Sequence, residues 1–182
     1  LRQCPEEVLT SQSHFVIAEN SMARHRFAHA LLHNQRCLEN WREQGLTDPI
    51  GKACLQRGII FRGMDLNTEA RALWNEAMEY FELSDNAHGT GTCLLKLADL
   101  HRVNGALSEA QLLLGQSIQF LTRAEDIPAI HAAEGILGDV YRDRGQYAKA
   151  RPLYEKGLAF WSARSHHRWI ASFEQRLQSL SA

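Results

Sequence analysis

Apolar residues along this chain step by three or four positions, and the stepping is interrupted at regular intervals. The pattern is clearest around residue 110, where the apolar positions are Leu94, Leu97, Leu100, Leu107, Ala110, Leu114, Ile118 and Leu121. This spacing gives one apolar stripe on each of two helices. Gly105 and Gly145, each suited to a left-handed turn, interrupt the pattern between two helices. The pattern therefore predicts helical hairpins.

The hairpin pattern repeats with a period of about forty residues, and five positions of the repeat keep their size class in four units. The small residues are Ala18, Gly58, Ala98 and Gly138, then Ala30, Ala70, Ala110 and Ala150, then Cys37, Ala77, Ser117 and Gly157. The large residues are Leu38, Met78, Ile118 and Leu158, then Trp41, Phe81, Leu121 and Trp161. Short side chains let two antiparallel helices approach to about 8 Å, and large ones fill the space between hairpins. One hairpin cannot bury both of its apolar faces, so we expect the hairpins to stack.

These features predict an all-α fold, a right-handed α-α solenoid of about four and a half helical hairpins. We expect a single repeat domain over residues 1–182. Its units fall at approximately 11–50, 51–90, 91–130 and 131–170, with a terminal helix over 168–181. Leu1 lies forty residues before Trp41 and takes the phase of a helix end from a preceding unit. The sequence thus predicts that the array continues upstream, as part of a longer array or a multidomain protein.

The fourth unit carries the most specific motif. It runs from Leu137 to Leu158 and contains L-G-x-x-Y, followed by alanine and aromatic residues at fixed distances. This segment resembles a tetratricopeptide repeat (TPR), with a weaker copy from Leu97 and a third from Gly58. The first unit departs most, with Asn34 where its siblings have apolar or aromatic residues. The period of forty, longer than the usual 34, is similar to that of kinesin light chain. It is also similar to the superhelical sensor regions of bacterial signal-transduction ATPases and transcription regulators.

Composition and charge narrow the range of partners. Twenty basic and twenty-one acidic residues leave a net charge of -1, so the excess of Lys and Arg that binds nucleic acid is missing. No apolar stretch approaches the roughly 18 residues that cross a bilayer. The four cysteines form no C-x-x-C pair, which favours a reducing, cytoplasmic location. Sixteen of the twenty basic residues are Arg, which is typical of a GC-rich bacterial genome.

The resemblance places the first helix of each hairpin along a concave groove. On that register the groove-binding candidates are Arg62, Arg102, Arg142, Asp99 and Asp139. A ladder of arginines could bind a carboxylate or a phosphate through forked hydrogen bonds. The alternative, which we favour, is that each Arg pairs with an Asp one turn earlier or in a neighbouring unit. Ile59 takes the Asp phase in the second unit, so Arg62 lacks that partner.

Two further motifs favour structural over chemical roles. His25, His29 and His33 have the four-residue spacing of metal-chelating imidazoles. Their repeat phases put them in different environments, so no metal site is expected. The glycine-containing stretch from Gly89 to Thr92 lacks the remainder of a phosphate-binding motif. We expect it to be a flexible connection between hairpins.

The sequence thus favours a non-catalytic scaffold that binds a protein, a peptide or a small effector in its concave groove. The resemblance implies the sensor or regulatory segment of a larger bacterial transcription regulator or signalling ATPase. The alternative is an adaptor for self-assembly through apolar array ends near Leu1 and Leu180. An enzyme is the least favoured class, because H-E-x-x-H, G-x-S-x-G and kinase signatures are missing. We expect no cofactor, no direct nucleic-acid binding and no membrane association.

Overall fold

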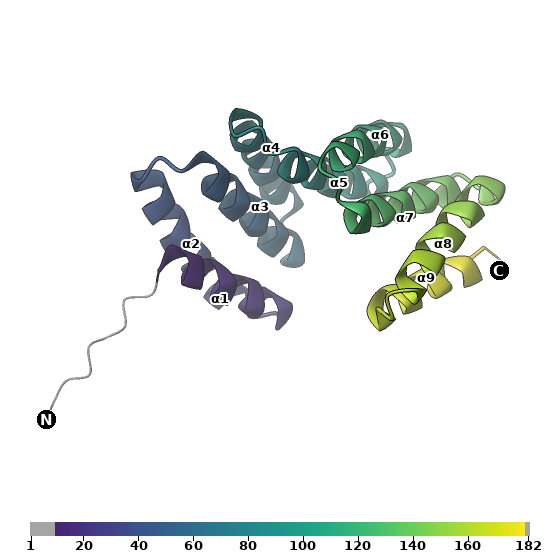
Figure 1. Ribbon diagram of the computed structural model, residues 1–182, viewed down its shortest axis with the longest axis horizontal. Helices are drawn as coiled ribbons and strands as arrows, with labels where there is room; N and C mark the ends of the chain where they lie inside the picture. Colours follow the sequence, from purple (N-terminus) through teal and green to yellow (C-terminus); the bar gives the residue numbers. More distant parts are fainter. Residues whose placement is uncertain (1–9, 181–182) are drawn as a thin grey trace, which may run out of the picture. The chain divides into compact units, whose positions relative to one another are not determined.

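The computed structural model describes residues 10–180, which form nine α-helices and no β-strand (Figure 1). The helices are α1 (Ser11–Ala23), α2 (Phe27–Glu43), α3 (Thr47–Gly63), α4 (Asn67–Leu83), α5 (Ala87–Val103), α6 (Leu107–Arg123), α7 (Ile127–Asp143), α8 (Tyr147–Ser162) and α9 (His167–Gln178). They form four successive hairpins and a final single helix, so the predicted all-α class is confirmed. Leu1, the basis for expecting an upstream unit, lies outside the described residues.

The helices keep the predicted period of forty. The first helices from the second hairpin onward, α9 included, begin at residues 47, 87, 127 and 167, and the second helices begin at 27, 67, 107 and 147. Each turn holds one residue with positive φ, and these residues are His25, Gly45, Asp65, Asp85, Gly105, Glu125, Gly145 and Ser165. A backbone hydrogen bond of 2.9 Å from Ala106 N to His101 O closes one such turn, which is the Schellman arrangement. Since only three of these eight residues are glycine, glycine is not required for the turn.

The described residues divide into two compact units, with the boundary between Asp85 and Asn86. Unit 1 contains the hairpins α1–α2 and α3–α4. Unit 2 contains the hairpins α5–α6 and α7–α8 together with α9. Within each unit consecutive helices pack against one another, and α5 also contacts α7, the first helix of the next hairpin. None of the helices described is long and apolar enough to cross a membrane.

At two small positions of the repeat, Gly58 and Gly138, an aromatic ring from the second helix of the same hairpin fills the space. A Cβ atom added at Gly58 would lie less than 3.0 Å from the Trp74 ring, and one added at Gly138 would clash equally with the Tyr154 ring. Both rings are almost fully buried, with Trp74 1% and Tyr154 0% exposed. The two pairs are eighty residues apart, and at both positions the missing side chain makes room for a large ring where the sequence predicted contact with a small residue.

The expectation for the stretch from Gly89 to Thr92 was wrong, because these residues lie within the first turns of α5. Asn86 caps this helix by accepting a hydrogen bond of 2.8 Å from Gly89 N. Gly91 packs against Leu121 of α6, and its carbonyl oxygen accepts a hydrogen bond of 2.6 Å from Ser117 Oγ. The glycines are therefore used for close helix packing.

Candidate binding groove

A groove with a volume of about 420 Å³ lies in unit 2, lined by the first helices α5, α7 and α9 and by the end of α8. Its apolar lining includes Leu95, Ala132, Ile136, Trp161 and Trp169. The two tryptophan rings stack, with their centroids 5.2 Å apart and their planes inclined by only 9°. A volume of this size and a mainly apolar wall are typical of sites for small molecules and short peptide segments.

A histidine and an aspartate contact each other at the groove. His88 Nδ1 lies 2.7 Å from Asp126 Oδ2. Asp126 also caps α7, because its Oδ1 accepts a hydrogen bond of 3.0 Å from Ala129 N. The pair thus links the beginnings of α5 and α7 and leaves no free carboxylate at this position.

A buried carboxylate holds the basic residue that α9 contributes to the groove. Asp139 is 5% exposed. Its oxygens accept hydrogen bonds of 3.1 to 3.2 Å from Nε and Nη2 of Arg176, and one of 2.9 Å from the Tyr154 hydroxyl. Arg142 Nη1 donates a further hydrogen bond of 3.3 Å. Burial and the adjacent Asp139 charge raise the pKa of Tyr154, so the phenol stays protonated and donates to Asp139. This cluster joins α7, α8 and α9.

Lys96 of α5 is the remaining basic group at the groove, and it is half-buried. It makes no hydrogen bond or salt bridge with any residue that the structure describes. Burial lowers the pKa of Lys96, although the Asp99 carboxylate opposes this effect. Asp99 cannot fully compensate the ammonium charge, because its Oδ1 already accepts hydrogen bonds of 3.1 and 2.9 Å from Arg102. Lys96 therefore presents a half-buried ammonium group to the groove without a directly bonded acceptor among the residues described.

The arginine ladder lies beside this groove and not among its lining residues. Besides Asp99, Arg102 contacts Asp143 Oδ2 at 2.9 Å. Arg142 binds Asp143 Oδ1 at 2.8 Å as well as Asp139. The Arg102–Asp99 and Arg142–Asp139 pairs have the spacing that the repeat indicated, whereas Asp143 was not among the predicted residues. In unit 1, Arg62 has only a 3.7 Å contact with the exposed Asp65.

Sequence reasoning missed Lys96. Its phase is shared by Val16, Gln56, Ile136 and Arg176, four side chains of differing chemistry, so no repeated residue type marked the position. The available signal was the placement of Lys96 one turn before Asp99 on the helix face that carries the predicted ladder.

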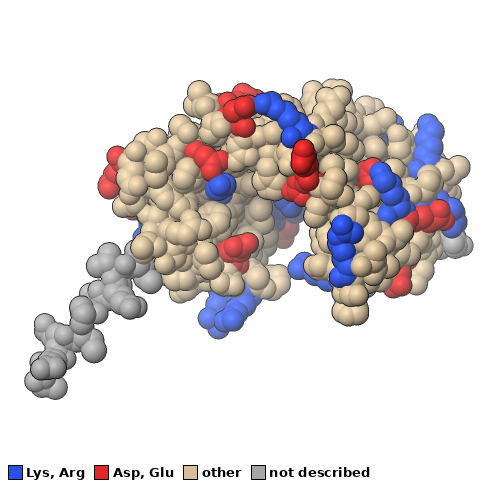
Figure 2. Space-filling model, in the orientation of Figure 1, with Lys and Arg blue, Asp and Glu red and all other residues tan. Residues whose placement is uncertain are grey.

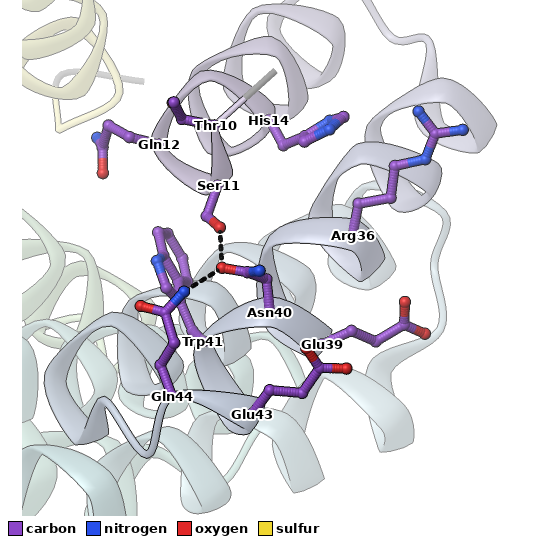
Figure 3. A pocket seen from close by; sticks show the side chains of 10 residues that line it. All are labelled: Thr10, Ser11, Gln12, His14, Arg36, Glu39, Asn40, Trp41, Glu43 and Gln44. Carbon is purple, nitrogen blue, oxygen red and sulfur yellow. Dashed lines mark hydrogen bonds between the residues drawn. The ribbon is translucent and has the colours of Figure 1, made fainter. Parts of the chain in front are cut away.

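Unit 1 has a larger but more polar cavity of about 820 Å³ at α1 and α2. Figure 3 shows Ser11, Asn40 and Gln44 converging there, where Asn40 Oδ1 accepts two hydrogen bonds of 2.6 Å. Arg36 and Glu39 also line it and extend separately toward solvent. Because its polar groups bond to one another and its charges are of both signs, this cavity offers less for a specific ligand.

The predicted separation of the three histidines holds only in part. His25 lies in the turn after α1, with φ of 56°. His33 is 8% exposed, and its Nδ1 lies 2.7 Å from Nδ1 of His14, a partner that the sequence did not indicate. His29 is exposed, but its ring centroid lies 4.5 Å from that of His33. Within residues 10–180, no group of three or more His, Cys, Asp or Glu could hold a metal ion.

Charged side chains of both signs are interspersed on the face shown in Figure 2, without a large area of one sign among the residues described. A surface of this kind lacks the basic stripe that follows a nucleic-acid backbone.

No protein-family model and no curated protein matches the chain. Solved structures do match it. Apo RapI gives a TM-score of 0.78 at 12% identity, covering 94% of this chain and 62% of RapI. A Rap protein complexed with competence and sporulation factor gives 0.65 at 19% identity, covering 94% of this chain and 52% of that protein. The TPR-like repeats of a putative kinesin light chain from Podosopora anserina give 0.67 at 16% identity, covering 93% and 84%.

The chain thus spans between about half and two thirds of the two Rap proteins. At these identities the likeness concerns the fold, which agrees with the L-G-x-x-Y motif and the hairpin period. The chain therefore has the α-solenoid fold of tetratricopeptide-like repeat proteins.

Proposed function

We propose that this chain is a non-catalytic scaffold that binds a peptide or an extended segment of a protein in the groove of unit 2. The observation that carries the proposal is the apolar groove itself, formed by α5, α7 and α9 and ending at the stacked Trp161 and Trp169. Binding sites are typically concave, mainly apolar and bordered by polar groups, as this groove is.

A regulatory setting within a larger bacterial protein is part of the same proposal. The arginine-rich composition and the forty-residue period support it. A Rap protein with the same fold has been solved with a bound factor, and this chain spans about half of that protein. We therefore propose a sensor or regulatory segment of a larger transcription regulator or signalling ATPase, with peptide binding as its input.

Self-association through the array ends is the alternative function, and the C-terminal end supports it less than the groove supports peptide binding. Phe173 of α9 is fully buried against Gly157, and Trp169 stacks on Trp161. The outward side of α9 is polar, with Glu174, Gln175 and Gln178 among its exposed residues. A polar outer face on α9 offers little apolar surface for stacking against a second copy.

The proposal is tested by panning a phage-displayed random peptide library against the purified chain. Ala132→Arg places a long side chain in the groove, and recovered peptides should lose at least ten-fold in affinity for this variant, about 1.4 kcal/mol. Ala148→Arg is the matched control, because Ala148 is exposed on α8 and does not line the groove. Peptides that bind both variants as tightly as the original chain would show that the groove is not the binding site.

A further inference from the structure

One ammonium group in the groove of unit 2, that of Lys96, lacks a direct partner and indicates the chemistry of the occupant. Two of its basic groups already have acidic partners, Arg176 with Asp139 and His88 with Asp126. Lys96 has no hydrogen-bonding or ion-pairing partner among residues 10–180. It is half-buried beside Leu95, which is only 7% exposed. An ammonium group in such surroundings loses hydration without gaining an ion pair.

We propose that Lys96 binds a carboxylate of the peptide that occupies this groove, so that the site selects acidic peptides with apolar neighbours. The inference rests on the proposed peptide-binding function. The half-buried ammonium group needs an anionic acceptor that can enter an apolar groove, and a single peptide carboxylate supplies one. A basic peptide is repelled by Lys96 and finds no free carboxylate, because both acidic groups in contact with the groove cations are already paired.

The surroundings of Lys96 specify the rest of the ligand. Ala132 and Ile136 of α7 line the same groove, as does the Trp161–Trp169 stack. Apolar side chains on either side of the acidic residue would bury surface against these groups. Displacing water from the groove would also strengthen the ammonium–carboxylate hydrogen bond, because charge-assisted bonds gain in a medium of lower dielectric constant.

The test uses pools of N-acetylated, C-amidated heptapeptides whose central residue is Glu, Gln or Lys and whose flanking positions are randomised over Leu, Phe, Ala and Ser. Binding is measured by isothermal titration calorimetry and by quenching of tryptophan fluorescence. The Glu pool should bind the chain at least ten-fold more tightly than the Gln pool, and the Lys pool more weakly still. A fourth pool, with Gln at the centre and a free C-terminal carboxylate, shows whether a chain terminus can replace the acidic side chain.

Lys96→Met removes the charge and keeps an unbranched side chain of similar length. This variant should bind the Glu and Gln pools equally, while Lys96→Arg should keep the preference for Glu. Lys52→Met is the matched control, because Lys52 is exposed on α3 and pairs with Asp48. The thermal midpoint of Lys96→Met should equal or exceed that of the original chain, since a desolvated ammonium group is removed. A loss of binding with an unchanged or higher midpoint cannot come from misfolding.

The outcomes separate the two proposals. If the original chain binds the Glu and Gln pools equally, or if Lys96→Met keeps the preference for Glu, the role of Lys96 is wrong and the groove remains a peptide site. If no pool binds and library panning yields no peptide that is sensitive to Ala132→Arg, the groove function itself is wrong.

Discussion

At their buried polar contacts, unit 1 joins its hairpins through neutral amide side chains, whereas unit 2 joins its hairpins and α9 through a charged cluster. In unit 1, Asn34 Nδ2 donates to Gln56 Oε1 at 3.1 Å and to Ala53 O at 2.9 Å. The positions three periods later are Tyr154 and Arg176, which both bind Asp139. The same two positions of the repeat thus carry a neutral polar contact in one unit and a buried carboxylate with its partners in the other.

This difference separates what the repeat requires from what it leaves variable. The repeat requires small residues where helices cross and large residues between hairpins, because these determine whether helices can pack. At the polar positions the repeat leaves the residue type variable, as Asn34 and Tyr154 show. An amide costs less to desolvate than a carboxylate, and a buried carboxylate is stable only when donors surround it. Unit 2 should therefore be more sensitive to the loss of a single polar residue.

The largest effect is expected for Asp139→Ala. The substitution leaves Arg176, Arg142 and the Tyr154 hydroxyl without their shared acceptor, and breaking a buried ion pair costs about 3–5 kcal/mol. Gln56→Ala in unit 1 should cost about 1–3 kcal/mol, because it removes a neutral hydrogen-bonding partner. Urea unfolding followed by circular dichroism measures both changes. A cost for Asp139→Ala no greater than that for Gln56→Ala would contradict the contrast between the units.

The packing positions should respond alike in both units. Gly58→Ala and Gly138→Ala force a Cβ atom against Trp74 and Tyr154, and each should cost about 1–3 kcal/mol through overpacking. Gly115→Ala on α6 is the control, since an added Cβ there meets no atom within 4 Å. That variant should gain up to about 1 kcal/mol from helix propensity. A tolerated Gly58→Ala beside a costly Gly138→Ala would show that the two hairpins are packed differently.

The features of the fold that could be predicted from the sequence were those that repeat every forty residues. Small and large side chains at fixed phases located every hairpin, because helix crossing imposes the same steric condition each time. The stretch from Gly89 to Thr92 was misread as a connection, since glycine marks both turns and close helix contacts. Capping by Asn86 and packing against Leu121 place these residues in α5.

The candidate site could be predicted only in part. The spacing of Asp99 and Arg102, repeated forty residues later, indicated the ion pairs correctly because both partners lie on one helix. Lys96 could not be recognised in this way. Whether it has an ion-pair partner depends on the residues that α7 and α9 place around the groove, and the sequence of α5 does not show these. The contact between His14 and His33 was missed for a similar reason, because the two residues lie on different helices and have no counterparts in the other units.

That histidine contact gives unit 1 its own dependence on pH. Burial, and then Arg36, lower the pKa of His14 below its ordinary value of 6.5, and burial, His29, His14 and Arg36 do the same for His33. The unfolded chain therefore binds more protons below about pH 6.5, so stability should fall as the pH drops through this range. The urea midpoint measured between pH 8 and pH 5 should show this decline.

The matched variant carries His14→Leu and His33→Leu together, because Leu is found at the corresponding phases in Leu94 and Leu73. This double variant should lose most of the decline in unit 1 between pH 6.5 and pH 5. An unchanged pH profile would assign the acid sensitivity to other groups.

The smallest change in the free energy of unfolding is expected for Arg62→Ala. Within the arginine ladder, Arg62 of unit 1 has a weaker ion pair than Arg102 of unit 2. Arg62 makes one 3.7 Å contact with Asp65, whose side chain is 93% exposed, and such a surface pair contributes about 0–1 kcal/mol. Arg102 is 19% exposed and binds both Asp99 and Asp143, so Arg102→Ala should cost about 1–3 kcal/mol. Urea unfolding should also show that 0.5 M NaCl reduces the difference between the two variants, because added salt screens ion pairs. Equal costs for the two substitutions would mean that the Asp partners of Arg102 do not stabilise unit 2, and the ladder would then be free to bind a ligand.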